Sequence, residues 1–145
     1  MKIQRISRAA HIPPDSVLQR WARVALARPA TVTLRVVAEV EGRRMNREFR
    51  GKDYATNVLT FVYENTPRRS LGGDVVLCAP VVAREARAQE KTLEAHCAHL
   101  IVHGLLHLQG FDHESAADAA RMERRERSIL ARLGFPDPYR AERGG

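Results

Sequence analysis

Three histidines at fixed spacing constrain this chain more than any other feature. They are His103, His107 and His113, with Gly110 between the second and the third. On an α-helix, residues four apart lie about 40° apart around the axis, so the first two imidazoles share one face. Gly110 can end the helix in a left-handed conformation and turn the chain, so that His113 returns to the same point. Three imidazoles with a fourth position left open are the composition of a catalytic zinc site. The sequence therefore predicts a helix that carries a metal centre.

The other histidines and the two cysteines are predicted to have structural roles. His96 and His99 precede the triplet on the same face of the predicted helix. We expect each to have its own hydrogen-bond partner; the alternatives are a partner that orients a ligand imidazole, or a spare ligand. His11 has no partner in the sequence and is expected at the surface. Cys78 and Cys97 form no CxxC pair, so we expect two buried, reduced thiols.

Length and charge limit the class of protein. A chain of 145 residues corresponds to one domain of about 150 residues, and a composition of 44% hydrophobic and 28% charged residues excludes wholesale disorder. The net charge of +7 favours a polyanionic partner: a nucleic acid, a ribonucleoprotein or an anionic membrane face. We find no apolar run long enough to span a membrane and no signal peptide in residues 1–14, so we expect a cytoplasmic protein.

Hydrophobic periodicity predicts an α+β domain, with three or four strands in one sheet and several helices packed on it. The predicted strands are residues 31–40, 57–63 and 74–79, and the predicted helices are residues 16–28, 41–50, 81–89, 92–110 and 115–133. Ser16 and Gln19 have capping-box spacing, Thr92 is the expected cap of the histidine helix, and Gly134 closes the last helix.

Three further segments lie outside the regular part of this prediction. Residues 64–70 are a predicted loop whose Arg68 and Arg69 are free to meet an anion. The mixed-charge run 121–127 is predicted to be a solvated helix face with local ion pairs. We expect one domain over residues 1–136 and a flexible tail over residues 137–145.

The residue after the first histidine bears on the reaction. Zinc peptidases have an HExxH motif in which the glutamate is the general base. Here Gly104 follows His103, and glycine cannot accept a proton. Three neutral ligands also leave a divalent ion its full charge, which favours an anionic substrate over a neutral peptide. The charge of the metal ion and the net charge of the chain both favour a phosphodiester substrate.

Three motifs in the same order give the chain a family resemblance. They are the histidine motif His-Gly-x-Leu-His-Leu-x-Gly-x-Asp-His over residues 103–113, the segment over residues 45–61, and Gly-Asp-Val-Val over residues 73–76. Together they resemble the YbeY endoribonuclease family over most of residues 31–113. The resemblance implies a single mixed sheet of three to four strands, with helices packed around a central metal-bearing helix.

The resemblance also implies a function. Members of the family are bacterial, zinc-dependent, single-strand-specific endoribonucleases of ribosomal RNA maturation, notably at the 3′ end of 16S rRNA, and of ribosome quality control. Their metal ligands fall on His103, His107 and His113, which would bind one zinc ion per chain, and their functional arginine falls on Arg50. The implied partners are single-stranded and ribosomal RNA, the small ribosomal subunit and its assembly factors.

Two other functions remain open from the sequence. One is a metallohydrolase of peptides or other small substrates, against which the missing glutamate counts. The other is a non-catalytic ribosome-binding protein with a structural zinc ion, for which Asp112 is a possible fourth ligand. The residues also leave open whether the attacking group is a zinc-bound hydroxide or the RNA 2′-hydroxyl.

Overall fold

Four strands form one mixed sheet in the part of the chain that the computed structural model describes, residues 1–5, 12–64 and 71–139. Their order across the sheet is β1 (Lys2–Arg5), β2 (Ala30–Val37), β4 (Leu71–Cys78) and β3 (Val58–Glu64). β1, β2 and β4 run parallel, whereas β3 is antiparallel to β4 and forms one margin of this sheet. The predicted α+β class with a single mixed sheet is confirmed.

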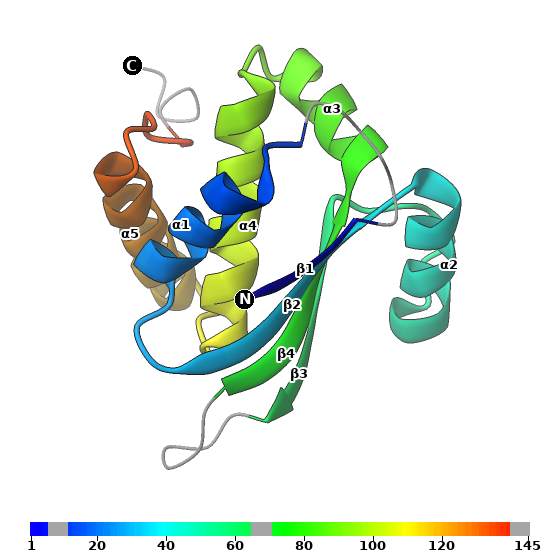
Figure 1. The fold of residues 1–145 in the computed structure, drawn as a ribbon, viewed down its shortest axis with the longest axis horizontal. Coiled ribbons are helices and arrows are strands. Elements are labelled where there is room, and N and C mark those ends of the chain that lie inside the picture. Colours follow the sequence, from blue (N-terminus) through cyan, green and yellow to red (C-terminus); the bar gives the residue numbers. More distant parts are fainter. Residues whose placement is uncertain (6–11, 65–70, 140–145) are drawn as a thin grey trace.

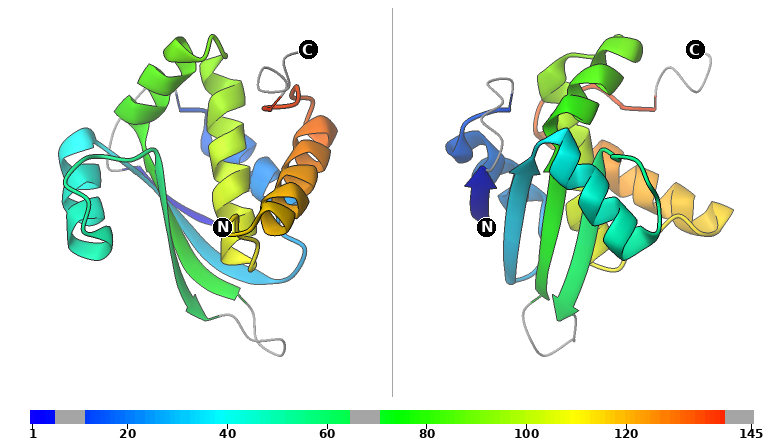
Figure 2. Two further views of the ribbon diagram at one scale, coloured as in Figure 1. Left: turned by 180° about the vertical axis from the view of Figure 1, so that it is seen from behind. Right: turned by 90° about the vertical axis from the view of Figure 1, so that its right-hand side faces the viewer.

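The helices cover both faces of the sheet (Figure 1). α4 (Leu93–Leu108) packs against β3 and β4, and also contacts α1 (Asp15–Ala25), α3 (Ala79–Ala88) and α5 (Ala116–Arg132). α2 (Glu39–Arg50) lies on the opposite face of the sheet from α4, as both views in Figure 2 show. α4 is therefore the central helix, as predicted, and it carries the first two histidines of the triplet.

Alternation along the strands divides the core into two clusters. Val32, Leu34 and Val36 of β2 point into the larger cluster, which α1, α4 and α5 cover. Val37 of β2 lies in a smaller cluster beneath α2, with Met45, Leu59, Val76, Cys78 and Val81. Cys78 and Cys97 are both buried and free, as expected.

The structure corrects several predicted boundaries. β2 ends at Val37 rather than at residue 40, because the chain turns at Ala38 and α2 begins at Glu39; Val40 is 84% exposed on that helix. α1 begins at Asp15, so Ser16 is inside the helix and is not its cap. β4 begins earlier than predicted, at Leu71. The short strand β1 was not predicted.

Some predictions fall on residues outside the described ranges. They concern the exposure of His11, the loop arginines Arg68 and Arg69, and residues 140–145 of the predicted tail. Within the described ranges, none of the helices is both long enough and apolar enough to cross a membrane.

Candidate metal centre

Local capping signals fix the helix that carries His103 and His107. The hydroxyl of Thr92 accepts a hydrogen bond from the backbone N–H of Ala95 at 3.1 Å, so α4 begins at the predicted cap. After Leu108 the chain turns through Gly110, whose φ of 100° lies in the left-handed region. The N–H of Gly110 then donates to the carbonyl of His107 at 3.1 Å, and that of Phe111 to the carbonyl of Leu106 at 3.2 Å. These two bonds form a Schellman motif, which directs the chain toward His113.

The turn brings the three imidazoles to one place. The ring centres are 6.4 Å apart for His103 and His107, 5.8 Å for His103 and His113, and 6.2 Å for His107 and His113. Three imidazoles on one zinc ion, each bound through nitrogen, would have ring centres roughly 5 Å apart. The rings therefore converge but stand wider than a closed coordination sphere. As placed in the described residues, no group of three or more His, Cys, Asp or Glu side chains is close enough to hold a metal ion.

The donor chemistry of the rings nevertheless fits a metal ion. The Nδ1 atom of His107 lies 3.0 Å from the carbonyl oxygen of Phe111, and because a carbonyl only accepts, Nδ1 carries the proton. The lone pair on Nε2 is thereby left for a ligand bond. Burial, followed by repulsion from His103, lowers the pKa of His107, which favours the neutral imidazole that metals bind. His103 has the same arrangement: its Nδ1 faces Oε1 of Glu126 at 3.4 Å.

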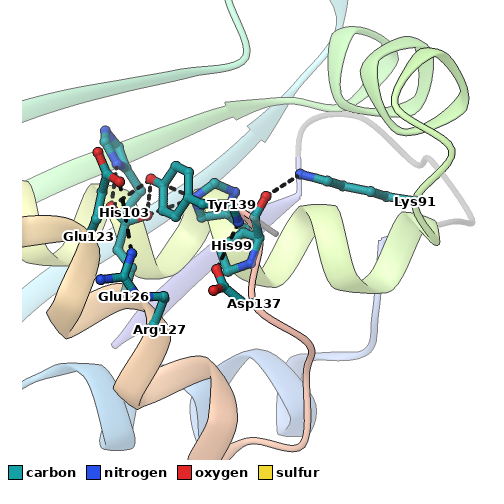
Figure 3. A network of polar contacts seen from close by, with 9 residues as sticks. Lys91, His99, His103, Glu123, Glu126, Arg127, Asp137 and Tyr139 are labelled. Carbon is teal, nitrogen blue, oxygen red and sulfur yellow. Dashed lines mark hydrogen bonds and ion pairs between the residues drawn. The ribbon is translucent and has the colours of Figure 1, made fainter. Parts of the chain in front are cut away.

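Glu126 is the centre of a buried polar network behind His103 (Figure 3). Its side chain is 1% exposed, and Oε2 lies 2.6 Å from Nε2 of His99. The hydroxyl of Tyr139 lies 3.0 Å from both carboxylate oxygens. Burial alone would raise the pKa of Glu126, but hydrogen bonds from His103 and His99 outweigh it and lower the pKa to about 2. A carboxylate that orients a ligand imidazole is a common partner in metal sites.

Glu126 belongs to the run predicted to form a solvated helix face, and for this residue the prediction is wrong. A signal for its burial was present in the apolar stripe of α5. Glu126 lies four residues after Met122 and three before Ile129, both of which are buried. A carboxylate on the apolar face of an amphipathic helix needs a buried partner.

The two upstream histidines have separate partners. His96 is buried, and its Nε2 lies 3.0 Å from Oε1 of Glu85, which also accepts a hydrogen bond from the side chain of Asn57 at 2.9 Å. His99 contacts Glu126 and Tyr139 instead. His96 therefore fits the expected structural role, whereas His99 belongs to the network behind His103.

Arg50 reaches the same cleft from the other side of β3. It is the last residue of α2, which Gly51 ends with a φ of 70°. Its guanidinium donates to the carbonyl of Thr60 at 2.8 Å. A cleft of about 220 Å³ is lined by Arg50, Val58, Leu59, Thr60, His103, His107 and His113. The structure thus brings together all four residues singled out from the sequence.

Close packing of α4 on the sheet explains the glycine after His103. A Cβ atom at Gly104 would lie 3.0 Å from Cγ1 of Val75 and 3.4 Å from Cγ2 of Thr60. Position 104 therefore faces the sheet, and a larger side chain there would need Val75 to shift. Glycine accepts no proton, so this position lacks the general base of a zinc peptidase. Asp112, the possible fourth ligand named above, accepts a hydrogen bond from the backbone N–H of Glu114 at 3.1 Å.

The fold and the cleft define a class: α+β proteins whose central helix carries two histidines of a converging three-histidine cluster, opposite an arginine. A family model described as "Endoribonuclease YbeY" matches residues 8–134. The chain belongs to this family. Endoribonuclease YbeY of Aromatoleum aromaticum is 61% identical, with 90% of this chain and 83% of the relative covered. Its counterpart from Methylobacillus flagellatus is 52% identical, with 99% and 95% covered.

A solved structure shows the same fold. The solution structure of TM1509 from Thermotoga maritima superposes with a TM-score of 0.59, and 91% of this chain and 90% of that chain are covered. The two sequences are 24% identical, so this likeness concerns the fold.

Proposed function

We propose that this chain is a zinc-dependent endoribonuclease that cleaves single-stranded RNA in ribosomal RNA maturation, at the 3′ end of 16S rRNA, and in ribosome quality control. The observation that carries the proposal is the cleft in which three imidazoles face the guanidinium of Arg50. The relatives are named as endoribonucleases, which supports RNA cleavage as the reaction, and the net charge of +7 suits a polyanionic substrate. On this proposal the chain acts in the cytoplasm, with the small ribosomal subunit and its assembly factors as partners.

In this proposal His103, His107 and His113 bind the ion. A bound divalent ion supplies Lewis-acid polarisation of a phosphoryl oxygen and lowers the pKa of water. The residues of the chain bind and orient the phosphate. Arg50 offers a planar fork of donors that can bind two phosphate oxygens at once, and it stays charged at working pH. Its hydrogen bond to the Thr60 carbonyl orients the guanidinium, so little reorganisation is needed when charge grows on the phosphate.

Two other functions have less support. A peptidase would need a general base next to His103, where Gly104 packs against the sheet. A purely structural zinc ion would need a fourth protein ligand. The cleft is instead open between the imidazoles and Arg50, which leaves room for a substrate.

Metal content and RNA cleavage, measured on the same preparations, test the proposal. We expect about one zinc ion per purified chain by elemental analysis, with the metal lost in His103→Ala, His107→Ala and His113→Ala. His96→Ala is the matched control, because this histidine bonds to Glu85 and should leave the zinc content largely unchanged. The substrate is a single-stranded RNA containing the 3′ end of 16S rRNA.

Three results would contradict the proposal. They are full zinc retention without His113, cleavage that survives chelation, and no cleavage of any RNA by the zinc-loaded protein. The chemistry of the product ends separates hydrolysis from attack by the 2′-hydroxyl.

A further inference from the structure

A second depression lies on the α2 side of the sheet, opposite the face that α4 covers. This groove, of about 300 Å³, lies between α2 and the strands β2, β3 and β4, and its lining includes Arg35, Arg44, Glu48, Phe49, Phe61 and Tyr63. Phe49 is 59% exposed and Tyr63 is 67% exposed. Contiguous exposed apolar surface is a feature of interaction sites.

The aromatic rings of the groove are ordered by their neighbours. Phe49 and Phe61 meet edge to face, with ring centres 5.3 Å apart. The hydroxyl of Tyr63 donates to Oδ2 of Asp74 at 2.5 Å, which fixes the direction of that ring. Alternation along β3 puts Leu59, Phe61 and Tyr63 on the α2 side, while Val58 and Thr60 face α4. The groove thus presents aromatic surface that is already oriented.

Arg50 connects this groove to the metal cleft. Its guanidinium carbon lies 5.6 Å from the centre of the Phe61 ring, and the same side chain lines the cleft of the three histidines. β3 is an outer strand of the sheet, so the cleft and the groove lie on the two sides of one margin. A strand that follows this margin would leave the imidazoles, pass the guanidinium and reach the aromatic rings.

We propose that the groove is a base-binding subsite for the RNA strand, in which Phe49 and Tyr63 stack on nucleobases while Arg50 binds the phosphate between groove and cleft. This inference rests on the proposed function. Every nucleobase has a flat π face, so aromatic stacking tolerates any sequence. A base must leave a duplex before both of its faces are free, so the subsite selects unpaired nucleotides. The arginines at the rim carry partners of their own, such as Glu48 at 3.2 Å from Arg44, so the rings supply most of the contact.

Binding of RNA with and without bases tests the subsite. The probes are a fluorescent single-stranded 12-mer, a length of about one short binding site, and the same oligonucleotide with abasic residues throughout. Dissociation constants are measured by anisotropy for the zinc-loaded protein and its variants. We expect Phe49→Leu and Tyr63→Leu each to weaken binding of the ordinary RNA at least about fivefold, because one stacked base contributes 1–3 kcal/mol. Both variants should bind the abasic RNA as wild type does.

Two matched variants separate stacking from a structural effect. Tyr63→Phe keeps the ring and loses the bond to Asp74 that orients it, so it should bind RNA more tightly than Tyr63→Leu does. Tyr54→Leu removes an aromatic ring that is 57% exposed but lies outside the groove lining, and its affinity should not change.

The inference is overturned if Phe49→Leu and Tyr63→Leu bind ordinary RNA as tightly as wild type, in which case another partner would use the groove. It is also overturned if they lose the same factor on abasic RNA, since the bases would then not be recognised. Failure of the proposed function looks different, because wild-type protein would itself show no RNA cleavage.

Discussion

Glu126 offers the sharpest test of how the metal centre is held together. Its carboxylate accepts from His103, His99 and Tyr139. Glu126→Leu leaves these polar groups without their acceptor, and removing one partner of a buried ionic network costs about 3–5 kcal/mol. Glu126→Gln keeps the shape of the side chain and one acceptor oxygen, but turns an amide N–H₂ toward a group that donated to the carboxylate. We expect this variant to lower the free energy of unfolding by about 1–3 kcal/mol. Each kcal/mol lowers Tm by about 2–4 °C for a domain of this size.

The effect on metal binding separates positioning from stability. Without the carboxylate, the His103 ring is free to rotate and its Nδ1 proton is no longer fixed, so Nε2 is presented to the ion only part of the time. Loss of such a partner lowers metal affinity about 10- to 100-fold. Competition of the protein against a chromophoric zinc chelator measures this affinity below the melting temperature, where Glu126→Gln is still folded.

Glu123→Gln is the control for this experiment. Glu123 lies one turn earlier on α5 and lines the same cavity as His103 and Glu126, but its carboxylate pairs with Arg127 at 3.9 Å. Glu123→Gln therefore removes one negative charge near the histidines but keeps the hydrogen bond between Glu126 and His103. If Glu126→Gln binds zinc as tightly as wild type, or if both variants lose the same factor, the positioning role is refuted.

Three further outcomes follow from the structure. Arg50→Ala should keep its zinc and its Tm but lose about a hundredfold in the rate of single-turnover RNA cleavage. Arg50→Lys should recover only part of that rate, because an ammonium lacks the planar fork of donors. Cleavage at the wild-type rate by Arg50→Ala would show that Arg50 has no role in the reaction. Gly73→Ala should lower the free energy of unfolding by about 1–3 kcal/mol in a urea titration, because the new Cβ would overlap the carbonyl oxygen of Phe61 on the neighbouring strand; an unchanged midpoint would show that the strands separate without cost. Affinity for single-stranded RNA should fall steeply with salt, since lysine and arginine displace condensed counterions; a flat dependence would argue against binding dominated by phosphate contacts.

The ends of α4 and α5 were predictable because their signals are local. Thr92 and Ser115 each accept a hydrogen bond from the backbone three residues later, and Gly110 and Gly134 both adopt positive φ. Capping depends only on residues close in sequence, so the residues that fix the helix of His103 and His107 can be identified from the sequence. The turn toward His113 could be predicted for the same reason.

Features that depend on distant partners could not be predicted in this way. The burial of Glu126 depends on His99 of α4 and on Tyr139, which follows α5. β1 has four residues and is held by its pairing with β2, about thirty positions later in the sequence. The position of Arg50 opposite the histidines was available only from the family resemblance, because its sequence position alone is that of an ordinary surface arginine.

The strand order also bears on how the chain folds. β3 and β4 follow one another in sequence and pair antiparallel, with Val58 opposite Leu77, whereas β2 must pair with β4 across the whole of α2 and β3. Contacts between close segments form sooner, because less loop entropy is lost in closing them. We expect amide protons of β3 and β4 to become protected first in pulsed hydrogen exchange, and those of β2 later. The β3–β4 hairpin, on whose two faces the metal cleft and the aromatic groove lie, would then take shape on a partly folded chain, before β2 joins it.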